Sequence, residues 1–180
     1  MVFRTLAAAV LALTLGTPAF AQDSSNYELF RQVERRVQQY PFISIFDSVH
    51  IGVSDGVVEL TGKVTMPYKR DGIAERVAKV SGVTAVRNRI TVLPVSQFDD
   101  DLRVRIARAI YSNPNFRGYG SRVNPPIHVI VERGRVTLEG VVNNNTDRVI
   151  AQSIASSFGA FKITSELKTI DEAKRDLERL

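Results

Sequence analysis

Asp55-Gly56-Val57-Val58-Glu59-Leu60-Thr61-Gly62 decides how this chain folds, because the same pattern returns in the second half of the sequence. There it reads Arg133-Gly134-Arg135-Val136-Thr137-Leu138-Glu139-Gly140. In both copies a glycine is followed by Val-x-Leu-x-Gly, with apolar residues at every second position. That alternation is typical of a strand that buries one face only. The repeat indicates a tandem duplication.

Each copy is preceded by a second alternating run. Val49-His50-Ile51-Gly52-Val53 precedes the first turn, and Ile127-His128-Val129-Ile130-Val131 precedes the other. Two alternating runs joined by a short glycine-containing turn predict a β-hairpin. The sequence therefore predicts one hairpin in each half of the chain.

Composition narrows the class of protein. The chain has 180 residues, of which 44% are hydrophobic, so it can form one ordinary or two small packed domains. Its formal net charge of +5 permits weak attraction to anionic surfaces without requiring it. The sequence has no cysteine, which excludes disulfides, thiolate metal sites and a lipoprotein anchor.

Residues 1–21 have the pattern of a secretory signal peptide. Arg4 supplies the positive start, Leu6–Leu15 an apolar core, and Ala19-Phe20-Ala21 a small-x-small cleavage site. We therefore expect export and cleavage after Ala21. The alternative is an uncleaved membrane anchor, for which the apolar run is short.

Apolar residues at helical spacing predict two helices in the first half. One begins at Tyr27, after the polar cap Asp23–Asn26, and ends near Tyr40-Pro41. The other spans Lys69–Val80 and is ended by Gly82. A third strand follows and stops at Pro94.

The second half repeats this order. Leu102, Ile106 and Ile110 mirror Leu29, Val33 and Val37 of the first helix. Arg148–Phe158 is the predicted second helix, and Ile163–Thr169 the last strand. The predicted fold class is α+β, with two tandem αββαβ modules, each a three-stranded sheet with two helices on one face. The predicted division is signal peptide 1–21, first module 22–95, second module 96–170 and helical tail 171–180.

Two features distinguish the second half. Asp99-Asp100-Asp101 places negative charge at a helix N-terminus, where the helix dipole favours it. The connection between the first helix and the first strand is longer than in the first half. It runs from Asn115 to Pro126 and combines aromatic and cationic residues.

This arrangement resembles the BON domain, a module named after bacterial osmotically induced and nodulation proteins. The resemblance covers Tyr27–Pro94 and Phe98–Ile170, and its strongest markers are the turn and strand-end glycines Gly56, Gly62, Gly134 and Gly140. Gly82-Val83 and Val86-Arg87-Asn88 also look like the family's pattern. The second half departs from it with Gly159-Ala160 and Ile163-Thr164-Ser165.

The resemblance implies a non-enzymatic protein of the periplasm or cell envelope that binds anionic phospholipid surfaces and supports envelope integrity under osmotic or other stress. We expect no cofactor and no metal, and predicted export argues against nucleic acid; envelope proteins are further candidate partners. In two-domain relatives, lipid contact is attributed to the first helix and nearby loop of the second domain. The corresponding positions here are Arg105, Arg108, Tyr111, Phe116, Arg117, Tyr119 and Arg122.

Several alternatives remain beside this interpretation. Phe116 and Tyr119 meet the needs of an interfacial lipid site, but they equally suit packing between the two modules. His50 and His128 stand at equivalent strand positions and suggest either a pH sensor or metal site across an interface, or a duplicated half-exposed residue, which we favour. No catalytic motif is present in the sequence. The main alternative function is a chaperone-like protein-binding module that uses an exposed sheet edge or apolar groove.

Overall fold

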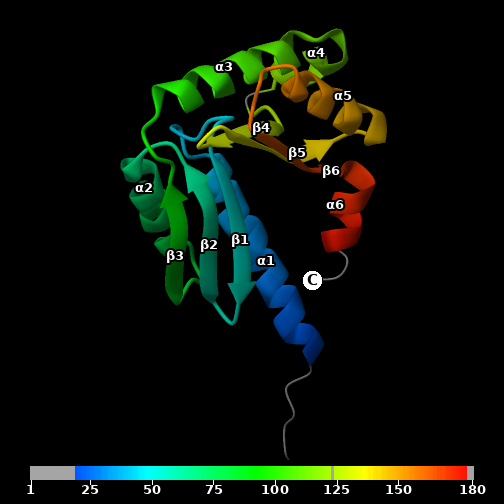
Figure 1. Ribbon diagram of the computed structural model, residues 1–180. Helices are drawn as coiled ribbons and strands as arrows, with labels where there is room; N and C mark the ends of the chain where they lie inside the picture. The colour runs from blue at the N-terminus through cyan, green and yellow to red at the C-terminus, as the bar shows by residue number, and fades with distance from the viewer. Residues whose placement is uncertain (1–18, 123, 178–180) are drawn as a thin grey trace, which may run out of the picture.

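Two three-stranded β-sheets, one from each half of the chain, form the framework of the protein (Figure 1). The computed structural model describes residues 19–122 and 124–177. The first half contributes α1 (Ala19–Gln38), β1 (Ser48–Ser54), β2 (Val57–Val64), α2 (Pro67–Ala78) and β3 (Ala85–Val92). The second contributes α3 (Gln97–Ser112), the 3₁₀ turn η1 (Pro114–Phe116), α4 (Arg117–Gly120), β4 (Ile127–Glu132), β5 (Arg135–Val142), α5 (Asn145–Ser156), β6 (Lys162–Thr169) and α6 (Ile170–Leu177).

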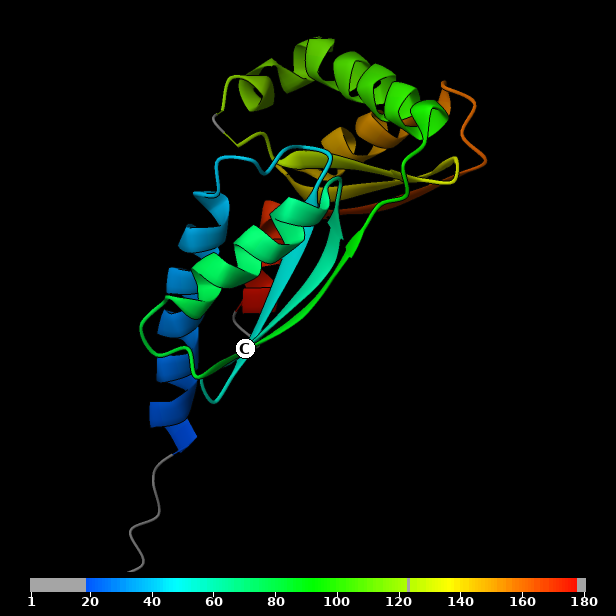
Figure 2. The same ribbon diagram turned by 90° about the vertical axis from the view of Figure 1, so that its left-hand side faces the viewer.

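Both sheets have the same topology. β1 pairs with β2 in antiparallel fashion and β2 with β3 in parallel, and β4, β5 and β6 repeat this order. The parallel pair needs a crossover connection, which α2 supplies in the first half and α5 in the second. Figure 2 shows α1 and α2 on one side of the first sheet. The predicted α+β fold with two tandem αββαβ modules is confirmed.

The two hairpin turns have the same backbone conformation. Asp55 and Gly56 have φ angles of 50° and 77°, and Arg133 and Gly134 have φ angles of 52° and 71°. Positive φ at both central residues defines a type I′ turn, whose twist matches that of the flanking strands. This geometry explains why both predicted turns end in glycine.

The glycine at the end of Val-x-Leu-x-Gly has a second structural reason. Gly62 and Gly140 have φ angles of 116° and 119°, in the region that disfavours other residues. A Cβ atom on Gly62 would collide with the carbonyl oxygen of Ser48, and one on Gly140 would collide with that of Pro126. The repeated pattern thus encodes a strand and the close backbone crossing at its end.

Each module has its own hydrophobic core between the sheet and the helices. The apolar residues of β2 are mostly buried, and in β3 Ile90 is buried while Val86 and Val92 are half-buried. The apolar residues of β1 are only partly buried, whereas those of the equivalent edge strand β4 are fully buried. In the first module the buried strand residues are Val58, Leu60, Val64 and Ile90, with Val49, Ile51 and Val53 packed against them.

The first helix differs from the prediction at its N-terminus. α1 already includes Ala19, so the polar residues 23–26 lie inside the helix and do not cap it. Asn26 instead accepts a hydrogen bond at its Oδ1 from the backbone N–H of Asp55, at 3.2 Å. Residues 1–18 of the predicted signal peptide lie outside the described residues, so export and cleavage after Ala21 stay predictions.

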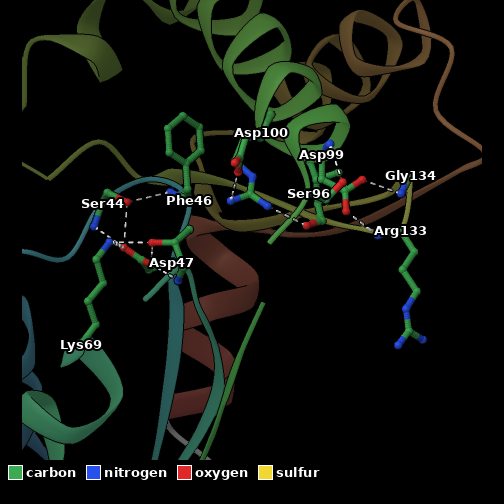
Figure 3. Close-up of polar contacts among 12 residues, drawn as sticks. Ser44, Phe46, Asp47, Lys69, Ser96, Asp99, Asp100, Arg133 and Gly134 are labelled. Atoms are coloured by element: carbon green, nitrogen blue, oxygen red, sulfur yellow. Dashed lines mark hydrogen bonds and ion pairs between the residues drawn. The ribbon is translucent and has the colours of Figure 1, made fainter. Parts of the chain in front are cut away.

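The acidic run of the second half has a more specific role than the predicted interaction with the helix dipole. Ser96 caps α3 by accepting the N–H of Asp99. The buried carboxylate of Asp99 accepts the backbone N–H groups of Arg133 and Gly134, both at 2.7 Å (Figure 3). Asp99 therefore ties the start of α3 to the hairpin turn, as Asn26 does in the first module.

The second helices of the modules begin earlier than predicted. α2 begins at Pro67, because proline is pre-organised for the first helical position. α5 begins at Asn145, because Asn144 caps it by accepting the N–H of Asp147. The connection Asn115–Pro126, predicted as a loop, is partly helical, since it holds most of η1 and all of α4.

The tail is held mainly by polar contacts. Thr169 and Glu172 form a capping box, in which each side chain accepts the backbone N–H of the other residue. The ion pair of Arg148 with Glu172, at 2.9 Å, fastens α6 to α5. Ile170 and Leu177 remain 39% and 41% exposed, so these two apolar residues of the tail are only partly covered.

The second module sits across one end of the first sheet, with the loop between α1 and β1 in the contact (Figure 2). Ile45 and Phe46 of that loop pack against the hydrophobic core of the second module. The carbonyl of Ile45 accepts the N–H of Val129 in β4 at 2.7 Å. Lys63 adds an ion pair with Glu132 at 2.5 Å. The modules therefore share a mixed apolar and polar interface.

Candidate functional site

The arginines among the predicted lipid-binding residues are exposed on two helices that contact each other. Arg105 and Arg108 lie on α3, Arg117 on α4, and Arg122 just beyond it. We call these residues the arginine surface. Within the described part of the chain, none of them forms an ion pair. Their charges are available to an external anion.

The predicted aromatic residues are placed differently. Phe116 is fully buried in the core of the second module, and Tyr119 is 3% exposed beside it. The two rings contact each other with centroids 5.6 Å apart. They cannot insert into a lipid surface from these positions, so their prediction as an exposed lipid contact needs correction. The packing alternative describes them better, although they fill the core of one module instead of a gap between two.

Tyr111 and Tyr119 each have a structural task for their hydroxyl group. Tyr111 is half-buried and donates to the carbonyl of Ile127 at 2.6 Å. Tyr119 donates to Asp147 at 2.7 Å. Its ring also lies under the guanidinium group of Arg122, 5.5 Å from the ring centroid, which orients that arginine at the surface.

A cleft of about 710 Å³ lies between the two modules. It opens where α1, the start of β1 and the end of β5 meet. Its lining combines apolar residues with acidic and imidazole groups. The lining includes Glu34, Val37, Val49, His50, His128 and Glu139.

His50 and Glu139 form a polar contact across the cleft. Nε2 of His50 lies 2.9 Å from Oε2 of Glu139, and Ser48 donates its hydroxyl to the same oxygen at 2.5 Å. The hydrogen bond to Glu139 raises the pKa of His50. Desolvation acts to raise the pKa of Glu139, but the hydrogen bonds from His50 and Ser48 outweigh it, and this pKa lies below its ordinary value.

His128 makes the second contact of an imidazole at this interface. Its Nδ1 lies 2.6 Å from the backbone carbonyl of Asp47, and a carbonyl only accepts, so Nδ1 carries the proton. Desolvation by burial lowers the pKa of His128. The two histidines stand at equivalent positions of the repeat, but the pKa of His50 is raised and that of His128 is lowered.

Neither a metal site nor a membrane span is found in the described part of the chain. No group of three or more His, Asp or Glu residues there is arranged to hold a metal ion. No helix there is long and apolar enough to cross a bilayer.

The family model of the BON domain matches residues 29–94 and 98–169, which together cover most of the sequence. The chain belongs to the BON domain family. Both matched segments fall inside the predicted modules and include the complete helix–hairpin–helix–strand order of each BON domain.

Two solved structures of CdsD, a structural protein of the type III secretion system of Chlamydia trachomatis, are similar to this chain. The C-terminal domain of CdsD matches with 16% identity and a TM-score of 0.33, covering 84% of this chain and 69% of the other. A second CdsD structure matches with 16% identity and a TM-score of 0.31, covering 84% and 97%. No curated protein matches the sequence significantly.

Sequence reasoning missed the contacts that join the two BON domains. Asp47 and Glu139 were not candidates, because each is one carboxylate in a chain that is 24% charged. The only sequence signal was the equivalent placement of His50 and His128, which indicated a common position but not a partner. The residues that the histidines contact come from the opposite domain.

Proposed function

We propose that this protein is a non-enzymatic component of the cell envelope that docks reversibly on anionic phospholipid through the arginine surface and helps the envelope withstand osmotic or other stress. The observation that carries the proposal is the set of exposed arginines on α3, α4 and the following turn, which have no carboxylate partner among the described residues. Phosphate groups are the natural partners of unpaired guanidinium groups.

The burial of Phe116 and Tyr119 gives this docking a specific physical character. Without aromatic rings at headgroup depth, attraction comes mainly from charge, roughly 1 kcal/mol for each arginine near an anionic membrane. Such attraction is screened by salt over about 10 Å at 0.1 M ionic strength. We therefore expect weak, salt-sensitive binding in place of stable insertion.

Co-sedimentation with vesicles tests the proposal. The protein should bind phosphatidylglycerol vesicles but not phosphatidylcholine vesicles, and binding should fall as NaCl rises from about 0.05 to 0.5 M. Arg117→Glu with Arg122→Glu should weaken binding at least about thirtyfold, the equivalent of roughly 2 kcal/mol. Equal binding by this variant and the unmodified protein would exclude the arginine surface.

A matched control reverses the same number of charges elsewhere. Arg35 and Arg36 are exposed on α1 and form no ion pair with a described residue. Arg35→Glu with Arg36→Glu should leave most of the vesicle binding intact. Phe116→Ser is unsuitable as a test, because it would open a cavity in the core of the second domain.

A protein-binding role is the second candidate function. The observation that favours it is the outer edge of β1, which no hydrogen bond from another described element covers. This role predicts suppression of client aggregation in the absence of vesicles, whereas lipid docking does not.

A further inference from the structure

The two BON domains treat their equivalent edge strands differently. In the second domain, other groups hydrogen-bond to the outer edge of β4 at Ile127, Val129 and Val131. The hydroxyl of Tyr111 accepts the N–H of Ile127 at 3.0 Å and donates to its carbonyl. Burial raises the pKa of Tyr111 to about 12, so this hydroxyl keeps its proton. Further along β4, Ile45 accepts the N–H of Val129.

The far end of β4 is closed by a side chain of α3. Arg103 is buried and donates to the carbonyl of Val131 at 3.1 Å. The matching helix positions in the first domain hold Phe30 and Gln38, in place of Arg103 and Tyr111. Neither forms a side-chain hydrogen bond to β1. The devices that close the second edge are therefore not repeated in the first.

The register of the first hairpin shows which groups this leaves open. Ser54 and Val57 flank the two-residue turn and face each other. In such a hairpin the flanking pair is hydrogen-bonded, and successive pairs alternate. The backbone N–H and C=O groups of Val49, Ile51 and Val53 therefore point away from β2. Within the described part of the chain, no group outside the hairpin hydrogen-bonds to them.

β1 also lacks the usual protection of an exposed edge. Natural edges carry lysine, proline, a bulge or a covering element, since an open edge is a template for pairing with another chain. β1 reads Ser-Val-His-Ile-Gly-Val-Ser and pairs with β2 without a bulge. Its only titratable side chain, His50, is directed to Glu139 of the second domain. The edge is thus both open and attractive to an extended segment.

The interdomain cleft indicates the chemistry of that segment. Glu34 on α1 lines the same cleft as Val37 and Val49, and it forms no ion pair with a described residue. A strand added to β1 would alternate its side chains between the helix-covered side, where these valines lie, and the opposite side. A basic side chain near the start of β1 would meet Glu34.

We propose that the outer edge of β1 binds an extended, alternately apolar segment of another protein as a fourth strand, with a lysine or arginine of that segment opposite Glu34. Main-chain hydrogen bonds to Val49, Ile51 and Val53 hold the segment, and the cleft selects its charge. A single strand suits the site better than a second copy of this chain, which brings a whole sheet, because α6 stands on the same side of the molecule as β1 (Figures 1 and 2). This proposal rests on the protein-binding role, the second candidate function, and is independent of lipid docking.

Amide hydrogen exchange with a synthetic peptide tests the edge directly. The probe is Lys-Thr-Val-Thr-Val-Thr-Lys, and its matched control has glutamate in place of both lysines. The lysine peptide should slow exchange at Val49, Ile51 and Val53 at least tenfold, with no change at the already closed Ile127 and Val129. Unchanged exchange at saturating peptide, or equal binding of both peptides, would overturn the proposal.

Proline at the centre of the edge separates backbone recognition from side-chain loss. The N–H of Ile51 points away from β2, so Ile51→Pro removes a docking donor without removing a ladder hydrogen bond. The Ile51→Pro variant should bind the lysine peptide with a dissociation constant at least tenfold higher than that of the Ile51→Ala variant. Glu34→Gln, which leaves the strand untouched, should lose the preference for lysine over glutamate. Equal affinity of the two Ile51 variants, or a retained preference in Glu34→Gln, would contradict the proposal.

The same amides report on self-association. If they slow with increasing protein concentration in the absence of peptide, and sedimentation shows a doubled mass, the edge belongs to a second copy and the proposal fails. Vesicle binding by the Arg117→Glu and Arg122→Glu variant is measured separately. Loss of lipid docking with intact peptide binding, or the reverse, therefore identifies which of the two proposals is wrong.

Discussion

The two BON domains use different side chains to accept the backbone N–H that follows their second strand. In the first, the carboxylate of Asp47 accepts the N–H of Thr65 at 2.7 Å and the ammonium group of Lys69 at 2.6 Å (Figure 3). In the second, the hydroxyl of Tyr119 accepts the N–H of Asn143 at 2.7 Å and donates to Asp147. In each case the backbone N–H follows the second strand, and the side-chain partner lies in the first turn of the next helix.

This comparison shows what the duplicated fold requires and what it leaves free. In both domains a polar side chain accepts the backbone N–H that follows the second strand. The fold does not require a particular side chain, because an acceptor that pairs with lysine and a hydroxyl that pairs with aspartate both meet the need. The longer connection of the second domain supplies Tyr119, and Asp47 comes from the shorter loop of the first. Loop length and side-chain chemistry have therefore changed together.

Removal of Lys69 is expected to have the largest effect. Its ammonium group is buried against Asp47, whose side chain is fully inaccessible. Lys69→Met would leave a buried carboxylate without its cation and should lower the free energy of unfolding by about 3 kcal/mol. Urea denaturation measures the loss, and amide exchange should quicken in β2 while that in β5 stays unchanged.

Two further variants show whether the charge or the cavity is responsible. Asp47→Asn combined with Lys69→Met removes both charges and should recover part of the lost stability. Lys79→Met removes an exposed lysine that pairs with Glu75 at the surface and should change stability by less than about 0.5 kcal/mol. A loss as large for Lys79→Met as for Lys69→Met would contradict this account.

Tyr119→Phe should have an intermediate effect, confined to the second domain. The substitution keeps the ring but removes the hydroxyl that serves Asn143 and Asp147. Because these two groups would lose their partner, the free energy of unfolding should fall by about 2 kcal/mol. Amide exchange at Asn143 reports the local consequence. If β2 and β5 lose protection equally, the two polar positions are not independent, and the comparison between the domains breaks down.

The smallest expected effects are those of His50 and His128 on the pH dependence of stability. His50 has a raised pKa, so its contribution is complete below its ordinary value of 6.5 and is lost as pH rises through the raised value. His128 has a lowered pKa, so its contribution is complete above 6.5 and is lost as pH falls through the lowered value. Most of the His50 side chain is solvent-exposed, which limits the size of its effect.

Glutamine variants separate the two contributions. Urea denaturation between about pH 5 and 8 gives the free energy of unfolding as a function of pH. This curve should be flatter on its alkaline side for His50→Gln and flatter on its acidic side for His128→Gln. The unmodified protein should be most stable between the two shifted values. Identical pH profiles for both variants would show that the equivalent histidines do not act in opposite directions.

The sequence predicts the repeated architecture well because that architecture is encoded locally. Gly56 and Gly134 mark the turns, and Gly62 and Gly140 mark the crossings at the ends of the second strands. Helix starts are less predictable, because they depend on single residues such as Pro67 and Asn144. α1 shows this clearly, since four polar residues that look like a cap lie inside the helix.

The candidate site could be predicted only in part. The exposed arginines of α3 and α4 follow from position on a helix, whereas the burial of Phe116 depends on how the long connection folds back on the core. Pairs such as Asp47 with Lys69, or His50 with Glu139, join residues that only the tertiary fold brings together. Periodicity in the sequence carries no information about such partners.

The contact of Ile45 with β4 has a consequence for how the chain matures during synthesis. Translation delivers the first domain before the second, so the loop that covers the edge of β4 exists before β4 itself emerges. Phe46 is likewise synthesised before the apolar residues of the second domain against which it packs. A gene with the two halves exchanged would reverse this schedule and leave a bare strand edge during the interval, when aggregation is most damaging.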